Sequence, residues 1–488
     1  MTIPKEVKSV IDSLKKAGFE AYVVGGCVRD FLRGKEPEDW DVATLAKPEE
    51  IQKTFPKSFY NNQFFTVAVQ TGSRNPKLKE IEITTFRSEA KYTDKRHPDE
   101  IKFAKTIEED LSRRDFTINA LALKITRPGL VDIIDPFAGQ KDLKNKIIRA
   151  VGNPEDRFSE DALRMMRAVR FSVTLGEGWK FEEKTRQGVK KNAFWLGAIS
   201  KERIRDEFLK IIMTERAADG IELLRELGLL KFILPELEEG FGVGQNKHHI
   251  YECYEHSLLS LKYAAEKNFN KYVRLASLLH DVGKPRVKQG EGSDATFYNH
   301  EIVGTKMTIQ ILNRLKFPKK EIEKIAKLVR YHLFYYNVGE VSESSVRRLV
   351  RQVGPENMEE LLQVRMADRI GSGVPKAEPY KLRHLKYTVE KVSQDPISVK
   401  TLEIGGNEVM KILNIEPGPR VGQILDVLLG EVLEDPKKNK KDFLEKEVKK
   451  LGKLSEKELS SLVQKAKKER EKIEQKRDEM TKKKYWVT

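Results

Sequence analysis

Two aspartates one residue apart, shortly after a double glycine, leave few folds open to the N-terminal part of this chain. The apolar run 22–24 predicts a short strand, and Gly25 and Gly26 predict a turn that opens a helix. Asp39 and Asp41 follow in a second strand-like segment, so their carboxylates are expected on one face. Such a turn can hold phosphate, and Mg²⁺ removes the repulsion between neighbouring carboxylates. The pattern predicts phosphoryl or nucleotidyl transfer, with a solvated acidic loop as the alternative.

Composition favours a polyanionic partner. The chain has 488 residues and a net charge of +16. Residues 437–488 hold 19 Lys+Arg against 10 Asp+Glu, a balance of +9, so more than half of the excess lies in the tail. This balance favours RNA or DNA over a membrane surface, with a lysine-rich solubilising surface as the alternative. No membrane span or signal peptide is expected, and two distant cysteines, Cys27 and Cys253, fit a reducing cytoplasm.

The chain changes character near residue 150. Before it, expected strands alternate with helical segments, which predicts an α/β domain. Beyond it, periods of 3.6 residues predict helices. The expected strands are 21–24, 39–44, 64–70, 80–85 and 101–103, and the expected helices include 48–54, 161–174, 201–214, 217–227 and 455–484.

A third carboxylate, Glu82, falls on an alternating strand and is expected beside Asp39 and Asp41. Three carboxylates can hold two metals, one for an attacking hydroxyl and one for a triphosphate. The polar segment 88–98 has no apolar face and predicts a loop.

Further polar residues follow in the segment 110–120. Arg114 is expected to reach phosphate. Asp115 and Asn119 have i, i+4 spacing and are expected to meet a ribose.

The predicted helix around residues 160–171 carries an unusual polar stripe. Asp161, Arg164, Arg167 and Arg170 recur every three residues beside an apolar stripe. A carboxylate and a guanidinium in this arrangement can read the amino-plus-acceptor edge of cytosine or adenine. The alternative is a surface helix with Asp–Arg pairing.

These motifs occur in one order along the chain, and the set resembles the class II tRNA nucleotidyltransferases. That family contains the CCA-adding enzymes and is related to the bacterial poly(A) polymerases. The resemblance covers residues 20–235 and continues more weakly at 404–406 and 417–422. The motifs are GGCVRD, DWDVAT, EITTFR, KYTDKRHP, RRDFTINA, EDALRMMRAVRF and KERIRDE.

The resemblance implies a role for each matching residue. Asp39 and Asp41 would bind Mg²⁺, with Glu82 near the primer hydroxyl. Gly26 and Arg29 would contact the triphosphate, with Gly25 in the same turn and Arg114 nearby. Asp161 and Arg164 would template the base, assisted by Arg167 and Arg170, with Arg203 on a supporting helix. Asp115 and Asn119 complete the expected nucleotide-binding residues because of their spacing.

The chain departs from the family pattern in one segment. Many CCA-adding members have a Gly-Thr-Val strand after the metal carboxylates, whereas residues 61–67 here read NNQFFTV. The Gly-Arg/Lys-Arg-Phe run of the poly(A) branch is also absent. The loop at 88–98 is present, and members that add only CC lack it. Full CCA addition therefore ranks first and A-only addition second.

A second set of residues resembles the HD phosphohydrolases. His256, the pair His280-Asp281 and Asp368 occur in the expected order. Mixed imidazole and carboxylate ligands suit Mn²⁺, Ni²⁺, Co²⁺ or Fe²⁺ better than Mg²⁺. His300 and His332 are candidates for a second metal or for contact with phosphate. A helix-end His–Asp hydrogen bond is the structural alternative.

The expected architecture is multidomain: an α/β, polymerase β-like nucleotidyltransferase head followed by all-α neck, body, HD and tail regions. The expected boundaries are a head at 1–150, a helical neck and body at 151–240, an HD-type metal domain at 241–395, and a helical tail with a basic C-terminus at 396–488. The resemblance implies addition of CCA to tRNA from CTP and ATP, and the HD region is a candidate phosphohydrolase.

Other functions stay open at this stage. They are an A-adding enzyme or poly(A) polymerase, an HD phosphohydrolase with a vestigial head, and a non-enzymatic RNA-binding protein recruited through the basic tail. Intact Asp39, Asp41 and Glu82 argue against a vestigial head. The expected partners are tRNA, CTP and ATP, with no membrane, and the sequence leaves the oligomeric state open.

Overall fold

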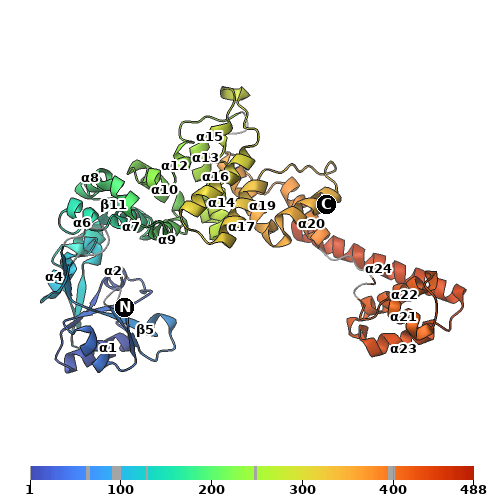
Figure 1. Ribbon diagram of the computed structural model, residues 1–488, viewed down its shortest axis with the longest axis horizontal. Helices are drawn as coiled ribbons and strands as arrows, with labels where there is room; N and C mark the ends of the chain where they lie inside the picture. The colour runs from blue at the N-terminus through green and yellow to red at the C-terminus, as the bar shows by residue number, and fades with distance from the viewer. Residues whose placement is uncertain are drawn as a thin grey trace. The chain divides into compact units, whose positions relative to one another are not determined.

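The computed structural model describes residues 2–61, 66–90, 100–127, 130–246, 250–393, 399 and 402–487. The chain forms two compact units, Met1–Leu333 with Gln363–Pro375 and Phe334–Leu362 with Lys376–Thr488. Strands gather in the N-terminal part of the first unit, and helices make up most of the rest (Figure 1). Most of the predicted loop at 88–98 and most of the departing segment 61–67 lie outside the described residues.

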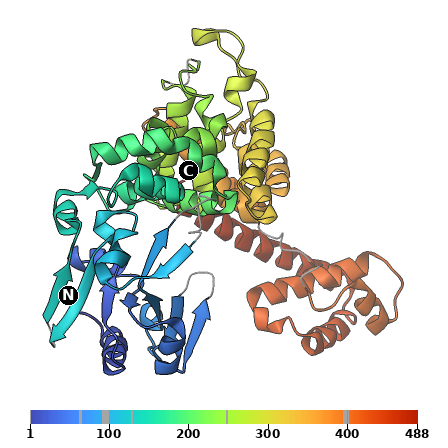
Figure 2. The same ribbon diagram turned by 60° about the vertical axis from the view of Figure 1, so that its left-hand side comes forward.

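A seven-stranded mixed sheet forms the centre of the N-terminal region, as Figure 2 shows. Its spatial order is β3-β4-β5-β2-β1-β8-β9. Strands β2 and β5 pair in parallel, and β2 pairs with β1 in antiparallel. The strands are β1 (Ala21–Val24), β2 (Asp41–Thr44), β3 (Ser58–Asn61), β4 (Thr66–Gln70), β5 (Glu80–Thr85), β8 (Ala122–Arg127) and β9 (Leu130–Ile134).

Both faces of the sheet are buried, which explains the apolar runs in its central strands. On one face, Val23, Val42 and Ile83 join a core that includes the apolar stripe of the first helix. On the other face, Tyr22 and Ala43 join a second core. The helices of this region are α1 (Lys5–Lys16), α2 (Gly26–Leu32), α3 (Pro48–Thr54), α4 (Ile107–Ser112) and α5 (Gly139–Asn145). The predicted α/β head is confirmed.

The structure differs from the sequence expectations at several element ends. Strand β2 begins at Asp41, so Asp39 lies in the bend before it and does not share a strand face with it. The predicted helix 161–174 begins only at Leu163, because Asp161 is extended, with φ −138° and ψ 103°. The predicted strands 64–70 and 101–103 are found as β4 and as β7 (Glu100–Phe103), which pairs with β6 (Arg87–Ala90) outside the main sheet.

Helices follow the head in the first unit, as the 3.6-residue period predicts. A two-stranded parallel ladder joins β10 (Ile147–Ile148) and β11 (Lys180–Phe181). Helix α19 (Met358–Gly371) enters this unit at Gln363. The other helices are α6 (Pro154–Glu160), α7 (Leu163–Thr174), α8 (Glu183–Asn192), α9 (Lys201–Ile212), α10 (Ala217–Glu226), α11 (Leu230–Ile233), α12 (Pro235–Glu238), α13 (Cys253–Glu266), α14 (Lys271–Leu279), α15 (Lys284–Val287), α16 (His300–Arg314) and α17 (Lys319–Tyr331).

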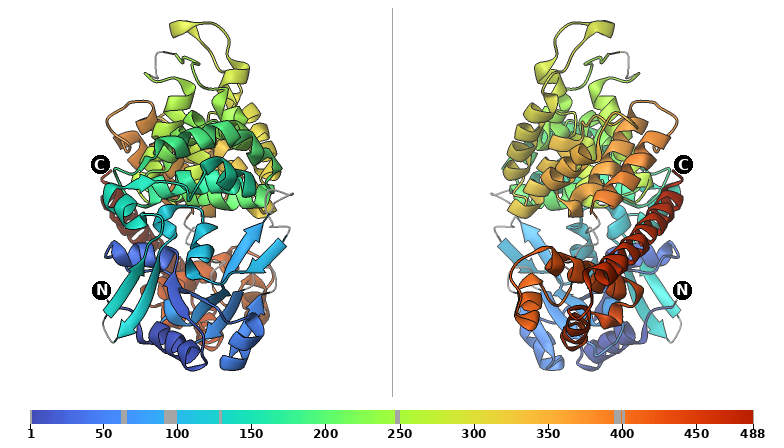
Figure 3. Two further views of the ribbon diagram at one scale, coloured as in Figure 1. Left: turned by 90° about the vertical axis from the view of Figure 1, so that its left-hand side faces the viewer. Right: turned by 90° about the vertical axis from the view of Figure 1, so that its right-hand side faces the viewer.

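The second unit is helical and has its own apolar core. The predicted long charged helix is present as α24 (Glu456–Tyr485), and a capping box between Ser455 and Glu458 starts it (Figure 3). The other helices of this unit are α18 (Glu343–Val353), α20 (Tyr380–Ser393), α21 (Gly406–Leu413), α22 (Pro419–Glu434) and α23 (Lys441–Leu451). None of the helices in the described ranges has the length and hydropathy that crossing a bilayer requires.

One buried arginine joins three helix ends in the first unit. Arg274, on α14, is 1% exposed. Its guanidinium donates to the carbonyl oxygens of Ile212 (2.9 Å), the last residue of α9, and of Thr214 (2.7 Å), just after it, and to Phe269 (2.8 Å) after α13. These carbonyls lie at or just beyond helix C-termini, where no intrahelical donor is left for them. Arg274 therefore fixes the packing of α9 against α13 and α14.

We expect Arg274→Met to destabilise the first unit by about 2–5 kcal/mol, because it leaves several buried carbonyls without donors. Urea unfolding measures the change, and hydrogen exchange of α9 and α14 locates it. The exposed Lys320→Met on α17 is the control, with a change within about 0.5 kcal/mol. Equal shifts for the two variants would contradict the role given to Arg274.

Candidate active site and metal centre

Three carboxylates gather at the centre of the head sheet. Asp41 on β2 and Glu82 on β5 are direct partners in the parallel register. Burial raises the pKa of Asp41 to about 7, with the charges of Asp39 and Glu82 adding to the shift. Burial also raises the pKa of Glu82, and Asp39 adds to that shift. Repulsion between carboxylates held this close is relieved by protonation or by a neighbouring cation.

The double glycine lies directly beside these carboxylates. Gly25 has φ +84°, which favours glycine. A Cβ at Gly25 would lie 2.8 Å from Nη1 of Arg114 and 3.3 Å from Oδ2 of Asp41. The close approach of backbone, guanidinium and carboxylate leaves no room for a side chain here. Gly26 begins α2, which carries Arg29.

Buried acids hold the cations of this site in place. The Asp110 side chain is fully buried and pairs with Arg113 (2.9 Å) and Arg114 (3.5 Å). Arg29 donates to Oδ1 of Asn119 at 2.8 Å and pairs with Asp30 at 2.7 Å. These contacts direct two guanidinium groups toward the double glycine, where a phosphate would lie.

Asp115 and Asn119 interact with each other and with arginines. Asn119 donates to Oδ1 of Asp115 at 3.0 Å, and Nε of Arg167 donates to Oδ2 at 2.8 Å. Burial raises the pKa of Asp115, but the charge of Arg167 and these hydrogen bonds outweigh it and hold the pKa at about 2. Asp115 is therefore an ionised anchor for Arg167.

The four residues of the predicted polar stripe each pair with a different partner; Arg167 pairs with Asp115, as described above. Asp161 lies in the break between α6 and α7, and Arg203 pairs with it at 2.7 Å. Arg164 pairs with Glu160 at 2.6 Å, and Arg170 pairs with the buried Glu207. The prediction that these four residues share one helix face is wrong, because the extended backbone at Asp161 interrupts the helix.

The HD residues converge in the helical part of the first unit. His256 comes from α13, His280 and Asp281 follow α14, and Asp368 comes from α19. Nε2 of His256 lies 2.9 Å from Nε2 of His280 and 3.1 Å from Oδ2 of Asp281. Oδ1 of Asp368 lies 3.4 Å from Nε2 of His256.

Two further histidines face the opposite oxygen of Asp281. Nε2 of His300, at the start of α16, lies 3.4 Å from Oδ1 of Asp281, and Nε2 of His332 lies 3.6 Å from it. Nδ1 of His280, His300 and His332 is 2.7–2.8 Å from a backbone carbonyl. Each carbonyl accepts from Nδ1–H, so each Nε2 is left as a potential metal ligand.

The donor set fits transition metals. Burial lowers the pKa of His280, but contacts with Asp281 and Asp368 outweigh it and raise that pKa to about 10. A proton on the imidazole thus neutralises the negative charge of the carboxylates, and a bound divalent ion would displace that proton. Described residues form two overlapping candidate groups, His256–His280–Asp368 and His280–Asp281–His332. Imidazole with carboxylate suits Mn²⁺, Fe²⁺, Co²⁺ or Ni²⁺.

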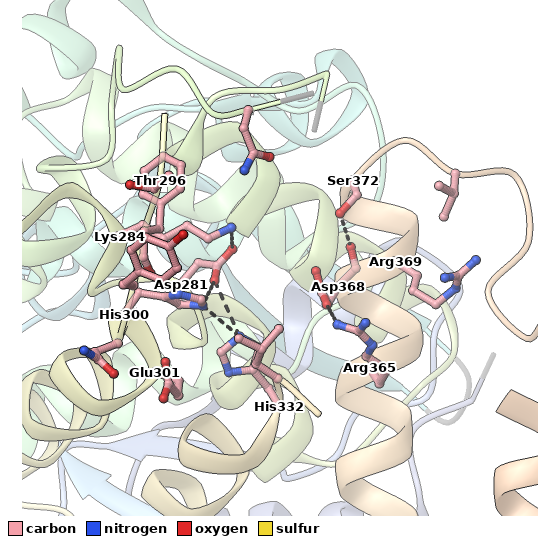
Figure 4. Close-up of a pocket in the computed structure, with 16 residues that line it drawn as sticks. Asp281, Lys284, Thr296, His300, Glu301, His332, Arg365, Asp368, Arg369 and Ser372 are labelled. Atoms are coloured by element: carbon pink, nitrogen blue, oxygen red, sulfur yellow. Dashed lines mark hydrogen bonds and ion pairs between the residues drawn. The ribbon is translucent and has the colours of Figure 1, made fainter. Parts of the chain in front are cut away.

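A pocket of about 760 Å³ opens beside this cluster. Lys284 lies 2.6 Å from Oδ2 of Asp281, and Arg365 lies 2.7 Å from Oδ2 of Asp368. Figure 4 shows Lys284, His300 and His332 converging on Asp281, while Arg365 reaches Asp368 from α19.

Sequence reasoning missed Asp110, Glu207, Lys284 and Arg365. Lys284 stands three residues after Asp281, and Asp110 stands before a double arginine. That local spacing could have identified both. Arg365 has the same three-residue spacing from Asp368 and could have been found in the same way. Glu207 carries no such signal, because only tertiary packing brings it to Arg170.

Three family models match the chain. The model of the poly A polymerase head domain matches residues 21–149, and that of the probable RNA and SrmB-binding site of polymerase A matches residues 178–241. The HD domain model matches residues 253–372.

The chain is similar to curated relatives over most of its length. A CCA-adding enzyme of Pediococcus pentosaceus is 34% identical over 455 residues, covering 92% of this chain and 98% of that protein. An A-adding tRNA nucleotidyltransferase of Deinococcus radiodurans is 34% identical, covering 84% and 92%. A CCA-adding enzyme of Lactobacillus delbrueckii subsp. bulgaricus is 52% identical over 221 residues, but that match spans only about half of either protein, 45% and 53%.

A solved structure is similar as well. The crystal structure of the Bacillus stearothermophilus CCA-adding enzyme in complex with CTP gives a TM-score of 0.59 at 28% identity. The match covers 92% of this chain and 98% of that chain.

The raised pKa of Asp41 makes a pH-dependent prediction about stability without metal. A carboxyl whose pKa is raised on folding destabilises the folded state by an amount that grows as the pH rises above its ordinary value of 3.8 and is complete above about 7. We expect Asp41→Asn to raise the thermal midpoint in EDTA more at pH 8, where this cost is complete, than at pH 5, where it is only partly developed.

The control for this measurement is Glu80→Gln, an exposed acid on the same strand as Glu82. It should change neither midpoint measurably. A stabilisation by Asp41→Asn that is equal at the two pH values would contradict the proposed charge repulsion.

Proposed function

Because this chain belongs to the tRNA nucleotidyltransferase family, which contains CCA-adding and A-adding enzymes, we propose that it adds CCA to the 3′ end of tRNA. The substrates would be CTP and ATP, the product pyrophosphate, and no nucleic-acid template would be used. The observation that carries the proposal is the carboxylate group of Asp39, Asp41 and Glu82 beside Gly25 and two anchored arginines. Similarity to a CCA-adding enzyme crystallised with CTP supports it.

In the proposed reaction, the 3′-hydroxyl oxygen of the tRNA attacks the α-phosphorus of the incoming nucleotide. A new P–O bond forms, the bond to pyrophosphate breaks, and the hydroxyl loses its proton. Mg²⁺ held by Asp39 and Asp41, with Glu82 beside them, would supply charge neutralisation for a two-metal transfer. Gly25 and Gly26 admit the triphosphate to the backbone, while Arg29 and Arg114 bind its oxygens.

Nucleotide selection is proposed for the region around α7. Asp161 would accept from the exocyclic amino group of cytosine or adenine, and Arg164 would donate to the ring nitrogen. Both residues pair with other side chains, Arg203 and Glu160, so nucleotide binding would have to exchange these partners. Beside the ribose, Asp115 would hold Arg167 in place and Asn119 would hold Arg29. Arg170, which pairs with Glu207, would support the same surface.

A-only addition is the second candidate. The A-adding relative is as similar as the CCA-adding relative with high coverage, 34% in each case, so identity does not separate the two activities. A poly(A) polymerase is a further alternative, supported by the head-domain match. Only the sequence of added nucleotides distinguishes them.

A separate hydrolytic site is proposed for the HD region. His256, His280, Asp281 and Asp368 would bind one transition metal, and His300 and His332 would bind a second through Oδ1 of Asp281. Such a site could activate water for attack on phosphoesters, including 2′,3′-cyclic ends. Hydrolysis with a vestigial head is the alternative, against which the intact head carboxylates argue.

The expected domain boundaries, 1–150, 151–240, 241–395 and 396–488, also stay a proposal. The helical regions would hold the tRNA. A cytoplasmic location fits the two buried free cysteines, Cys27 and Cys253.

The first test incubates tRNA lacking CCA with CTP, with ATP or with both, and product length is measured at single-nucleotide resolution. A CCA-adding enzyme extends the tRNA by two nucleotides with CTP alone and by three with both. Extension only of tRNA ending in CC, by one A, would establish the A-adding alternative.

Asp39→Ala and Asp41→Ala should each lower addition by several orders of magnitude and leave tRNA binding unchanged. Near-parent addition by either variant, with Glu80→Gln as the control, would refute the assigned site.

The second test combines His280→Ala with Asp281→Ala. Losing one imidazole and the shared carboxylate should abolish hydrolysis of 2′,3′-cyclic nucleotides in Ni²⁺ or Mn²⁺, and should lower bound metal measured by elemental analysis. CCA addition is the internal control and should persist. A parent protein that hydrolyses no phosphoester with any divalent ion would leave the HD site a structural one.

A further inference from the structure

The pocket beside the HD cluster extends well beyond the candidate metal ligands. Its volume of about 760 Å³ lies in the range of sites that enclose whole small molecules. Its lining continues along α19 to Arg365, Arg369 and Ser372. A site built only to hold metal ions and one phosphoryl group would not need this length.

Two arginines stand one turn apart on the α19 side of the pocket. Arg365 and Arg369 have i, i+4 spacing, at which like charges on a helix repel. Arg365 is partly neutralised by Asp368. Figure 4 shows that the side chain of Arg369 points away from Asp368 and does not join that ion pair.

The side chain of Arg369 forms no direct ion pair in the part of the chain that the structure describes, although the charge of Asp368 acts on it from a distance. No described acid forms an ion pair with it, and its buried Nε has no hydrogen-bond acceptor. The other pocket cation beside a candidate ligand, Lys284, is paired with Asp281, and Glu301 is paired with Arg330 outside the lining. A buried donor without an acceptor is costly, and an anionic ligand removes that cost.

Another part of the lining is aromatic and apolar. Tyr298 is 74% exposed and Leu333 is 52% exposed, and both line the pocket. Exposed aromatic side chains stack on nucleobases and are indifferent to base identity. The pocket thus combines a phosphoester centre, a second cationic position and a surface for a base.

We propose that Arg365 and Arg369 form a second anion subsite, which binds the last internucleotide phosphodiester of an RNA 3′ end whose terminal phosphate lies at the His–Asp cluster. This inference rests on the proposed phosphohydrolase function and defines its substrate as an RNA end in preference to a mononucleotide. Arg365 has a further positioning role toward Asp368, whereas Arg369 serves the phosphodiester alone.

The test compares uridine 3′-monophosphate with the dinucleotide UpUp, which adds one phosphodiester. Binding is measured by calorimetry on the full chain in EDTA, where neither probe is hydrolysed. The parent should bind UpUp about 10- to 100-fold more tightly, as expected for a charge-assisted contact. Arg369→Met should remove that preference, and the control Arg348→Met, an exposed arginine of α18 outside the pocket lining, should retain it.

Two results would overturn the proposal. One is the absence of the Arg369-dependent preference: the parent protein binds both probes equally, or the preference for UpUp survives in Arg369→Met. The other is that uridine 3′,5′-bisphosphate binds as tightly as UpUp and also depends on Arg369, which would assign the subsite to a nucleoside bisphosphate.

Hydrolysis with Ni²⁺ separates this inference from the function on which it rests. A raised KM for UpUp alone in Arg369→Met supports both. An Arg369-dependent binding preference without any hydrolysis would refute the phosphohydrolase function but retain the subsite. Hydrolysis of both probes with equal KM, unchanged in the variant, would refute the subsite alone.

Discussion

The parallel pairing of β2 with β5 is the constraint from which the head site follows. This register places Asp41 directly beside Glu82, and Asp39 precedes the same strand. Apolar side chains on both faces of the sheet hold the register, because a slip by one residue would move every one of them to the wrong face. The core therefore stabilises the proximity of carboxylates that repel one another, and the rest of the site compensates that repulsion.

Part of that compensation comes from Arg114, whose charge lowers the pKa of Asp41 and which Asp110 holds in place. Buried acids hold two further arginines nearby: Asp115 fixes Arg167, and Glu207 fixes Arg170. These acids are buried, and a buried charge without a partner is costly. The cost of leaving each acid unpaired therefore holds its arginine in place. The HD cluster follows the same logic: Lys284 pairs with Asp281 and Arg365 pairs with Asp368. Arg369 is the cation that departs from this pattern.

Much of both sites could be predicted from local sequence. The double glycine, the spacing of Asp39 and Asp41, and the His-Asp pair are short-range patterns whose chemistry is fixed by residue type. The α/β head and the long helix α24 followed from periodicity. The prediction that Asp161 lies on the same helix as Arg164 was wrong, because periodicity shows which residues could share a helix face and not where an extended residue interrupts the helix. The strand prediction was also wrong at Asp39, which lies before the strand.

The sequence by itself determined the residue types of each site, their order along the chain and the elements that carry most of them. Tertiary structure alone decided their long-range partners. Arg203 reaches Asp161 and His332 reaches the second oxygen of Asp281 across more than forty residues of chain, and His300 reaches the same oxygen from 19 residues away. Such contacts leave no local pattern, because they depend on how helices pack. A one-dimensional period encodes the buried face of each helix, but not the neighbour against which that face rests.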